Sequence, residues 1–526
     1  MNDGKKIKYN LIMGIFGQVL VLVFGILMPR LVITSYGSEI NGLLSSVTNI
    51  YAYVALLEAG VAGAACQALY KALADRNRND VNAVMAATNK YYHRTGVLYL
   101  VCIVALSIIY PIAIRSEIPY HTVVLVILLN GIGNVINFFF HGKYLILLKA
   151  DGKNYIRTGL DTFTNTMKQI AKIVLIGLGY DVVLVQLVAM IVSFIQMAYI
   201  TYYIKKNYIW LDLKAEPNME AIAHSKNVIA HEINFMLSAN TDGVLLAIFN
   251  TLKAVSVYSL YQMLFHTVFK VLFVVREAIE FKIADIYHKS REIFKRLFMA
   301  FEVYYITGAF AVLSVVYFFI LPFIRIYTQG VTDINYIIPT VPLLFVLNNM
   351  LLAGRYPVEV MIYISGHFKQ TQKSAVTETV INIVSSLALV QFWGMEGVLI
   401  GTLLAYLYRM IYLISYVNRN IICRSIKHTY LCLGINFAVF LITIYINRAI
   451  QIRLDSYFRI IIACIPYTVL TLLLYIGVVS LCIPDAFAAA LELVLGINRR
   501  SIKSSKSAGI RRKIKNNSAG SEGKEE

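Results

Sequence analysis

Two long apolar stretches at the start of the chain, residues 9–36 and 41–70, constrain the fold more than any other feature. Each exceeds the roughly 20 residues that an α-helix needs to cross a bilayer, and only a short turn separates them. Pro29 and Arg30 interrupt the first stretch, and Glu58 lies near the middle of the second. Such groups are tolerated in a membrane only where the helix faces protein or a water-filled cavity. We therefore expect this hairpin to line a cavity.

Composition extends this reading to the whole chain. Of the 526 residues, 58% are hydrophobic and 15% are charged, whereas a soluble domain carries about 25% charged residues. The sequence therefore predicts an all-α integral membrane protein with about fourteen transmembrane helices. The predicted spans are residues 9–36, 41–70, 94–114, 119–148, 158–179, 182–204, 227–250, 254–281, 297–321, 336–362, 374–392, 396–417, 428–447 and 460–483.

The predicted spans fall into two similar halves. A shift of 215 residues places the first hairpin on residues 224–285, and the break at Pro29 then falls beside the polar segment 240–243. Interrupted helices at matching places in two halves indicate a transport site. Because six spans precede the linker, the repeats are parallel. The expected domains are a six-helix lobe (1–207), a cytoplasmic linker (208–225), a second six-helix lobe (226–420), two further transmembrane helices (421–484) and a basic cytoplasmic tail (485–526).

The formal net charge of +19 would suggest nucleic-acid binding in a soluble protein. Here the basic residues sit mainly in short loops at alternate span ends, which is the positive-inside pattern of membrane proteins. We therefore expect no nucleic-acid partner, and we expect both termini to be cytoplasmic. The six cysteines are scattered with no metal-ligand spacing, so we expect neither a metal nor a cofactor.

Motifs of soluble enzymes are missing from the sequence. Residues 231–235 begin like a HExxH zinc motif but have Phe235 at the second histidine position. The Gly131 and Gly133 pair lacks the third glycine of a dinucleotide site, and no GxxxxGK[ST] phosphate loop occurs. We expect no enzyme activity.

Ionisable residues inside the predicted spans are the candidate functional groups. Each charge near the bilayer centre costs about 2.5–3.5 kcal/mol, so such groups usually face a cavity. The basic candidates for a substrate cavity are Arg30, Lys168, Lys172, Lys270 and Arg355. The acidic candidates for holding a coupling ion are Glu58 and Asp242. The alternative role is structural pairing, because Arg355 and Glu359 lie four residues apart on one helix.

Four short segments carry a family resemblance. They are YGSEINGL (residues 36–43), LLEAG (56–60), NTD (240–242) and VSVYS (255–259). Together with the span layout, they resemble Wzx-type polysaccharide flippases of the MOP (multidrug/oligosaccharidyl-lipid/polysaccharide) superfamily. The resemblance covers nearly all of the predicted spans.

The resemblance implies a bacterial inner-membrane protein that moves undecaprenyl-diphosphate-linked oligosaccharide from the inner to the outer leaflet. It also implies alternating access between two lobes around a cationic cavity. The implied partners are the lipid-linked oligosaccharide and membrane lipids, with a glycan polymerase and chain-length proteins as further partners. Two alternatives remain. One is a multidrug or cation antiporter of the same superfamily, and the other is a membrane glycan polymerase or ligase, which the short predicted outer loops disfavour.

Overall fold

The computed structural model describes residues 3–58, 61–222, 226–449 and 454–495, and these residues form helices and no strands. The long helices, in chain order, are α1 (Asp3–Tyr36), α2 (Ser38–Ala55), α3 (Val61–Ala74), α4 (Arg78–Ala113), α5 (Tyr120–Ile136), α6 (Gly142–Ala150), α7 (Asn154–Gly177), α8 (Val182–Asn207), α9 (Lys226–Phe249), α10 (Leu252–Lys289), α11 (Arg291–Tyr327), α12 (Thr340–Ser365), α13 (Phe368–Val417), α14 (Lys427–Ala449), α15 (Tyr457–Cys482) and α16 (Pro484–Leu495). Short turns of helix are η1 (Leu56–Glu58), η2 (Asn137–His141), η3 (Glu220–Ile222) and η4 (Asn418–Ile422).

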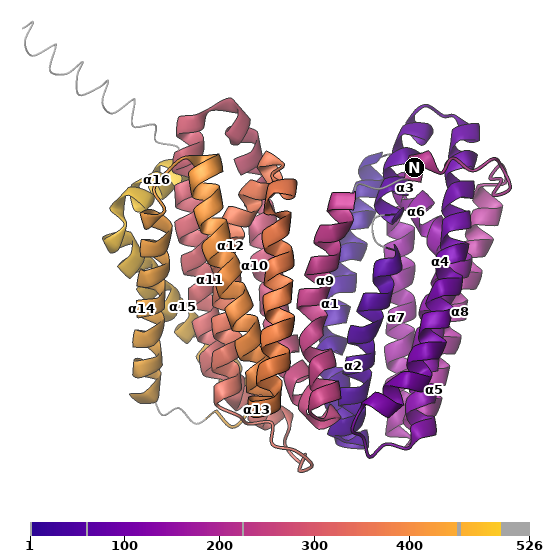
Figure 1. The fold of residues 1–526 in the computed structure, drawn as a ribbon, viewed down its shortest axis with the longest axis horizontal. Coiled ribbons are helices and arrows are strands. Elements are labelled where there is room, and N and C mark those ends of the chain that lie inside the picture. Colours follow the sequence, from indigo (N-terminus) through magenta and orange to yellow (C-terminus); the bar gives the residue numbers. More distant parts are fainter. Residues whose placement is uncertain (1–2, 59–60, 223–225, 450–453, 496–526) are drawn as a thin grey trace, which may run out of the picture.

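The all-α membrane fold expected from the sequence is confirmed. The described residues include 10 helical spans that are long and apolar enough to cross a membrane. The segments α2 with α3, α7 and α9 run alongside these spans (Figure 1). These additions, with the two halves of α13, account for the approximately fourteen spans that the sequence predicts.

The long stretch α13 is a helical hairpin that folds back at Gly394. This residue has φ 53° and ψ −122°, a conformation that residues with a side chain rarely adopt. The two halves pack closely, and Asn382 donates to Thr402 Oγ1 across them at 2.9 Å. The halves correspond to the predicted spans 374–392 and 396–417.

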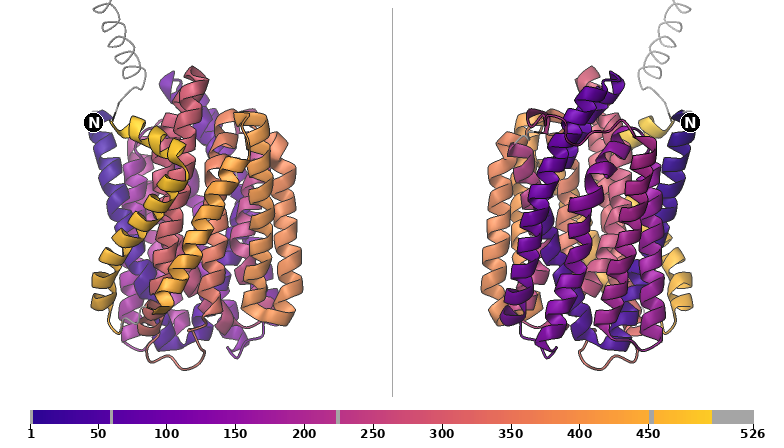
Figure 2. Two further views of the ribbon diagram at one scale, coloured as in Figure 1. Left: turned by 90° about the vertical axis from the view of Figure 1, so that its left-hand side faces the viewer. Right: turned by 90° about the vertical axis from the view of Figure 1, so that its right-hand side faces the viewer.

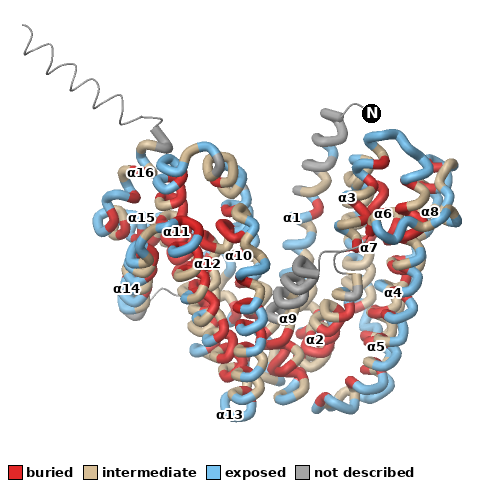
Figure 3. The backbone as a smooth tube through the Cα atoms, turned by 45° about the horizontal axis from the view of Figure 1, so that its top comes forward, coloured by how far each residue is buried: buried red, intermediate tan, exposed pale blue. Residues whose placement is uncertain are grey.

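The helices form two groups. The first contains α1 to α8, and the second contains α10 to α16, with α9 between α2 and α13 (Figure 1). The groups approach each other at the end where α1 passes into α2, and their ribbons spread apart at the end that carries the N-terminus (Figure 3). We call these the joined end and the N-terminal end of the molecule, and we call the two groups the first and second lobes.

The closest approach of the lobes is between α2 and α10 at the joined end. Gly42 lies so close to this partner that a Cβ atom built on it would stand 1.7 Å from the Leu252 carbonyl oxygen. Beside it, Asn41 Nδ2 donates to Ser256 Oγ at 2.8 Å. These two residues are 215 positions apart, which is the shift of the sequence repeat. Units related by a two-fold axis bring equivalent residues together at that axis, so this contact is the one that a two-fold repeat requires.

The connector after α8 packs on the first lobe, and the last helices, α14 to α16, pack on the second lobe. The connector after α8 lies on the first lobe, where Asn218 N donates to the Ala83 carbonyl at 3.1 Å. Helices α14 and α15 line one side of the second lobe, and α16 packs against α11 (Figure 2). Residues 496–526, most of the predicted basic tail, lie outside the described part of the chain, as do the side chains of His231 and Glu232.

The α13 hairpin yields a stability prediction. A Cβ atom on Gly397 would stand 2.2 Å from the Leu389 carbonyl oxygen, so Gly397→Ala must push the two halves apart and should destabilise the fold by about 1–3 kcal/mol. Gly477→Ala is the matched control, because nothing lies within 4 Å of its added Cβ and alanine favours helix by up to about 1 kcal/mol. Thermal unfolding in detergent measures both, and an unchanged Tm for Gly397→Ala would contradict the close packing.

Candidate functional site

A polar network joins the lobes around the start of α2. The carboxylate of Asp333, in the loop between α11 and α12, accepts from Ser38 N and from Ser38 Oγ, both at 2.7 Å. Tyr336 on the same loop donates to Ser38 Oγ at 2.6 Å and lies 2.8 Å from Ser256 Oγ. The first turn of a helix has free N–H groups that favour a negative charge. Asp333 of the second lobe therefore caps a helix of the first.

Arg30 belongs to this joint between the lobes. Its Nη1 donates to the Ile326 carbonyl at 3.1 Å and to the Tyr457 hydroxyl at 2.6 Å. The guanidinium also lies over the Tyr327 ring, 5.8 Å from its centroid. The sequence predicts Arg30 as a cavity cation. In this structure its hydrogen bonds link α1 to α11 and α15 instead.

Lys168 and Lys172 lie on one face of α7, which packs against α1 and α8 within the first lobe. Both side chains are half-buried. Among the described residues, no carboxylate lies within 4 Å of either ammonium group and neither makes a hydrogen bond. Lys168 interacts electrostatically with Asp161, His141 and Lys172. Asp161 is engaged elsewhere, with Gln196 Nε2 at 2.5 Å and Arg157 at 3.6 Å.

This lysine pair is electrostatically unfavourable as it stands. Like charges four residues apart on a helix repel each other, and the repulsion grows where the surroundings are less polar than water. The same helix carries Thr158, Asp161, Thr162 and Asn165 toward the same side. An anion placed between the two ammonium groups would relieve the repulsion, so the pair is suited to binding a negatively charged ligand.

Lys270 is the third predicted lysine, and it lies apart from this pair. It is exposed on α10 of the second lobe, one turn after His266. Within the described residues it has neither an ion pair nor a hydrogen bond. The structure therefore leaves Lys270 available to an anion but does not group it with Lys168 and Lys172.

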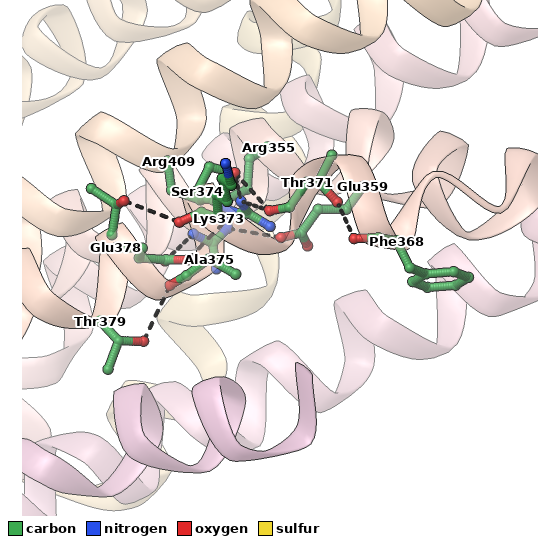
Figure 4. Close-up of polar contacts among 11 residues, drawn as sticks. Arg355, Glu359, Phe368, Thr371, Lys373, Ser374, Ala375, Glu378, Thr379 and Arg409 are labelled. Atoms are coloured by element: carbon green, nitrogen blue, oxygen red, sulfur yellow. Dashed lines mark hydrogen bonds and ion pairs between the residues drawn. The ribbon is translucent and has the colours of Figure 1, made fainter. Parts of the chain in front are cut away.

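Arg355 is locked in a buried ion cluster of the second lobe (Figure 4). Its guanidinium contacts Glu359 at 3.2 Å and also pairs with Glu378. Arg409 completes the cluster, with Nε 3.4 Å from Glu378 Oε2 and Nη1 3.1 Å from the Thr371 carbonyl. The two positive and two negative charges balance, and they connect α12 with both halves of α13. Arg355 thus forms ion pairs inside the lobe, which agrees with the alternative that it pairs with Glu359 for structural reasons.

Asp242 lies in a different setting, because its buried carboxylate is surrounded by neutral groups. It accepts from Tyr258 Oη at 2.9 Å and from Thr402 Oγ1 at 2.9 Å. Asn382 lies beside the same carboxylate, and its Oδ1 atom is buried without a hydrogen-bond partner. The Val398 carbonyl accepts from Thr402 Oγ1 at 3.2 Å. Oxygen atoms of this kind are the ligands that hard cations prefer.

Glu58 lies at the end of η1, and its half-buried carboxylate accepts a hydrogen bond from the Tyr92 hydroxyl. No cation lies within 4 Å of it in the described residues, and the two residues that follow it are outside that part of the chain. Glu58 on η1 and Asp242 on α9 bond different partners, Tyr92 and the pair Tyr258 and Thr402, so no shared hydrogen-bond partner links the two acidic candidates in the described residues.

Several residues of these clusters are not among the predicted site residues. Glu378 and Arg409 are charges inside separate predicted spans, and only the folding of α13 brings them to Arg355. Asn382 and Thr402 are neutral residues of ordinary spans. Asp333 lies in a predicted outer loop. A hairpin prediction for residues 374–417 could have placed Glu378 opposite Arg409. In an antiparallel helical hairpin, residues at about the same distance from the turn lie opposite each other.

Comparisons with known proteins place this geometry in a known fold. Neither a protein-family model nor a curated protein matches the sequence. A structure of the lipid II flippase MurJ in an inward closed conformation matches with TM-score 0.67 and 13% identity, covering 91% of this chain and 100% of that one.

Two multidrug MATE transporters also match. An inward-facing MATE transporter of the MOP superfamily has TM-score 0.58 at 14% identity, over 76% of this chain and 95% of its own. The transporter DinF-BH has TM-score 0.54 at 14% identity, over 79% and 95%. The chain therefore has the fold of MOP-superfamily membrane transporters.

The ion cluster yields a prediction about stability. Glu378→Gln removes the charge shared by Arg355 and Arg409 and leaves buried positive charge without compensation, which should cost about 3–5 kcal/mol of stability. Asp455→Asn is the control, because it breaks the exposed Arg459 pair, and exposed pairs contribute little. A fall in Tm for the first variant alone is expected. An equal Tm for the two variants would contradict the structural role of the cluster.

Proposed function

We propose that the chain flips an anionic lipid-linked oligosaccharide across a bacterial plasma membrane by alternating access between its two lobes. The observation that carries the proposal is the pair Lys168 and Lys172, two half-buried ammonium groups one turn apart with no carboxylate of the described residues within 4 Å. A diphosphate between lipid and sugar supplies the negative charge that this pair lacks, and amine groups replace part of its lost hydration.

The arrangement of the lobes supports alternating access. Hydrogen bonds from Ser38, Asn41 and Arg30 hold the lobes together at the joined end, and the helices spread apart at the other end (Figure 3). With the orientation that the positive-inside pattern predicts, the N-terminal end faces the cytoplasm. This state would admit substrate from the inner leaflet. One structural neighbour is a lipid II flippase, which favours a lipid-linked substrate over a drug.

The membrane potential can contribute to export. Carrying two negative charges outward from an inside-negative cell at about 100 mV releases roughly 4–5 kcal/mol. A sodium or proton gradient would be a second source of energy if the carboxylate of Asp242, which two hydroxyl groups bond, holds the ion in one conformation of the cycle. The hydroxyl oxygens of Tyr258 and Thr402 at this carboxylate, and the unpartnered Oδ1 atom of Asn382, fit that role. A glycan polymerase and chain-length proteins would then receive the exported units.

The lysine pair yields the main functional prediction. The double variant Lys168→Gln, Lys172→Gln should lower transport at least about tenfold, because each charge-assisted hydrogen bond to phosphate contributes more than a neutral one. Restoration of surface glycan in a flippase-deficient strain and transport of a lipid-linked oligosaccharide into proteoliposomes both measure it.

The matched control for this variant is Lys149→Gln, an exposed lysine at the end of α6, which should leave transport unchanged. Insertion and Tm of both variants are checked in parallel. Undiminished export by the double variant would contradict the cationic site. Rescue of drug resistance without rescue of surface glycan would favour the antiporter alternative.

Asp242 yields a separate prediction about coupling. Asp242→Asn keeps the size of the side chain but removes its charge, so the initial rate of transport should lose its dependence on a sodium or proton gradient. Thr402→Val, which removes one hydroxyl group from the same site, should weaken that dependence. Transport rates in proteoliposomes with and without each gradient give the answer, and an unchanged dependence in Asp242→Asn would contradict a coupling role.

A further inference from the structure

An open pocket of about 310 Å³ lies at the joined end of the second lobe. The turn between α9 and α10, the loop between α11 and α12, and the turn of α13 meet there. Polar groups of Asn250, Asn335 and Glu396 and the ring of Trp393 line it, over an apolar floor that includes Val257. Its volume is at the lower end of the range for small-ligand pockets.

The polar groups of this pocket have unused hydrogen-bonding capacity. Asn335 Oδ1 accepts from Ile337 N at 2.9 Å, and Glu396 Oε1 accepts from Thr340 Oγ1 at 3.0 Å. The other carboxylate oxygen and the other amide nitrogen of these two residues have no partner among the described residues. The side-chain amide of Asn250 and the indole N–H of Trp393 are equally free there. The pocket therefore presents both donors and acceptors.

The mixture of groups selects a class of ligand. Trp393 is 57% exposed and presents a flat aromatic ring beside these polar groups. A pyranose ring has apolar C–H faces, which pack on the electron-rich face of an aromatic ring, and a rim of hydroxyl groups, which bond amides and carboxylates. A phosphate would meet the Glu396 carboxylate and no lysine or arginine in the lining. A lipid tail would leave the polar groups without partners.

The backbone holds the parts of the pocket in place. Gly394, which follows Trp393, has positive φ and lies so close to Asn250 that a Cβ atom on it would stand 2.6 Å from Asn250 Nδ2. Asn335 lies between Asp333 and Tyr336, the two residues that bond Ser38 of the first lobe. The pocket is therefore built on the same loop that joins the lobes.

We propose that this pocket binds a neutral pyranose ring, and that its physiological ligand is a sugar of the exported glycan at the outer face of the protein. The identity of that ligand rests on the proposed function, whereas sugar binding itself does not. The pocket lies at the opposite face from the one open to the cytoplasm in the predicted orientation, so it would receive the glycan after the lobes have changed state.

Tryptophan fluorescence tests the proposal directly, because the chain has 2 tryptophans, Trp210 and Trp393. In the full-length Trp210→Phe protein, Trp393 is the sole tryptophan reporter. Titration with free glucose and with N-acetylglucosamine should give a saturable change in emission for at least one of them, with a Kd of roughly 1–10 mM, and should protect Trp393 from quenching by iodide.

Two variants in the Trp210→Phe background refine the test. Asn250→Ala removes an amide that faces the ligand and should raise the Kd about fivefold, the usual effect of losing one hydrogen bond. Phe392→Leu is the control, because this neighbouring side chain is 79% exposed and does not line the pocket, and it should leave the Kd unchanged. Tm values check that both variants are folded.

Two results would overturn the proposal. One is the absence of a saturable sugar response from folded protein. The other is strong quenching of Trp393 by brominated phosphatidylcholine, which would assign the ring to the lipid interface. Transport by the lysine double variant is measured separately. If the double variant loses transport as expected but the pocket binds no sugar, the pocket proposal alone is wrong. If the pocket binds sugar but the double variant transports undiminished, the proposed function alone is wrong.

Discussion

The close approach of α2 to α10 is the contact on which the arrangement of the two lobes depends. Gly42 provides the space for it, since any side chain there would collide with the Leu252 carbonyl. Around it, the buried apolar core continues from Leu43 on α2 to Val255 on α10, and hydrogen bonds from Ser38 and Asn41 add to the contact. Such bonds contribute about 0.5–1.5 kcal/mol each, because water replaces them when they break. The joint therefore combines apolar packing with hydrogen bonds that fix its geometry.

The charged residues of the predicted spans fall into two groups, those with an ion-pair partner and those without one in the described residues. Arg355 and Arg409 are neutralised by Glu359 and Glu378 and brace the interior of the second lobe. Lys168 and Lys172 have no such partners in the described residues, although burying a charge without compensation is expensive. The role of the paired arginines is to stabilise the second lobe. Under the proposed function, an anionic substrate supplies the negative charge that these lysines do not find in the described residues.

Much of the fold follows from the sequence, because span length and the polar breaks between spans are local properties. The repeat shift of 215 residues also relates Asn41 to Ser256, and the structure places these two residues in contact. The site was less accessible to prediction. The role of Arg30 depends on the Ile326 carbonyl and Tyr457, which reach it from helices almost 300 and more than 400 residues away. The four-residue spacing of Arg355 and Glu359 indicates one pair locally, whereas the partners of Arg30 and Arg409 depend on such long-range packing.

Movement of the lobes around an anionic lipid-linked sugar is the central claim. Distances between spin labels measure this movement directly, with one pair at the joined end (residues 35 and 332) and one at the N-terminal end (residues 75 and 282), all exposed. Addition of a lipid-linked oligosaccharide to protein in nanodiscs should lengthen the first distance and shorten the second. If both distances are the same with and without this substrate, while the protein transports it, the lobes do not alternate and the claim is wrong.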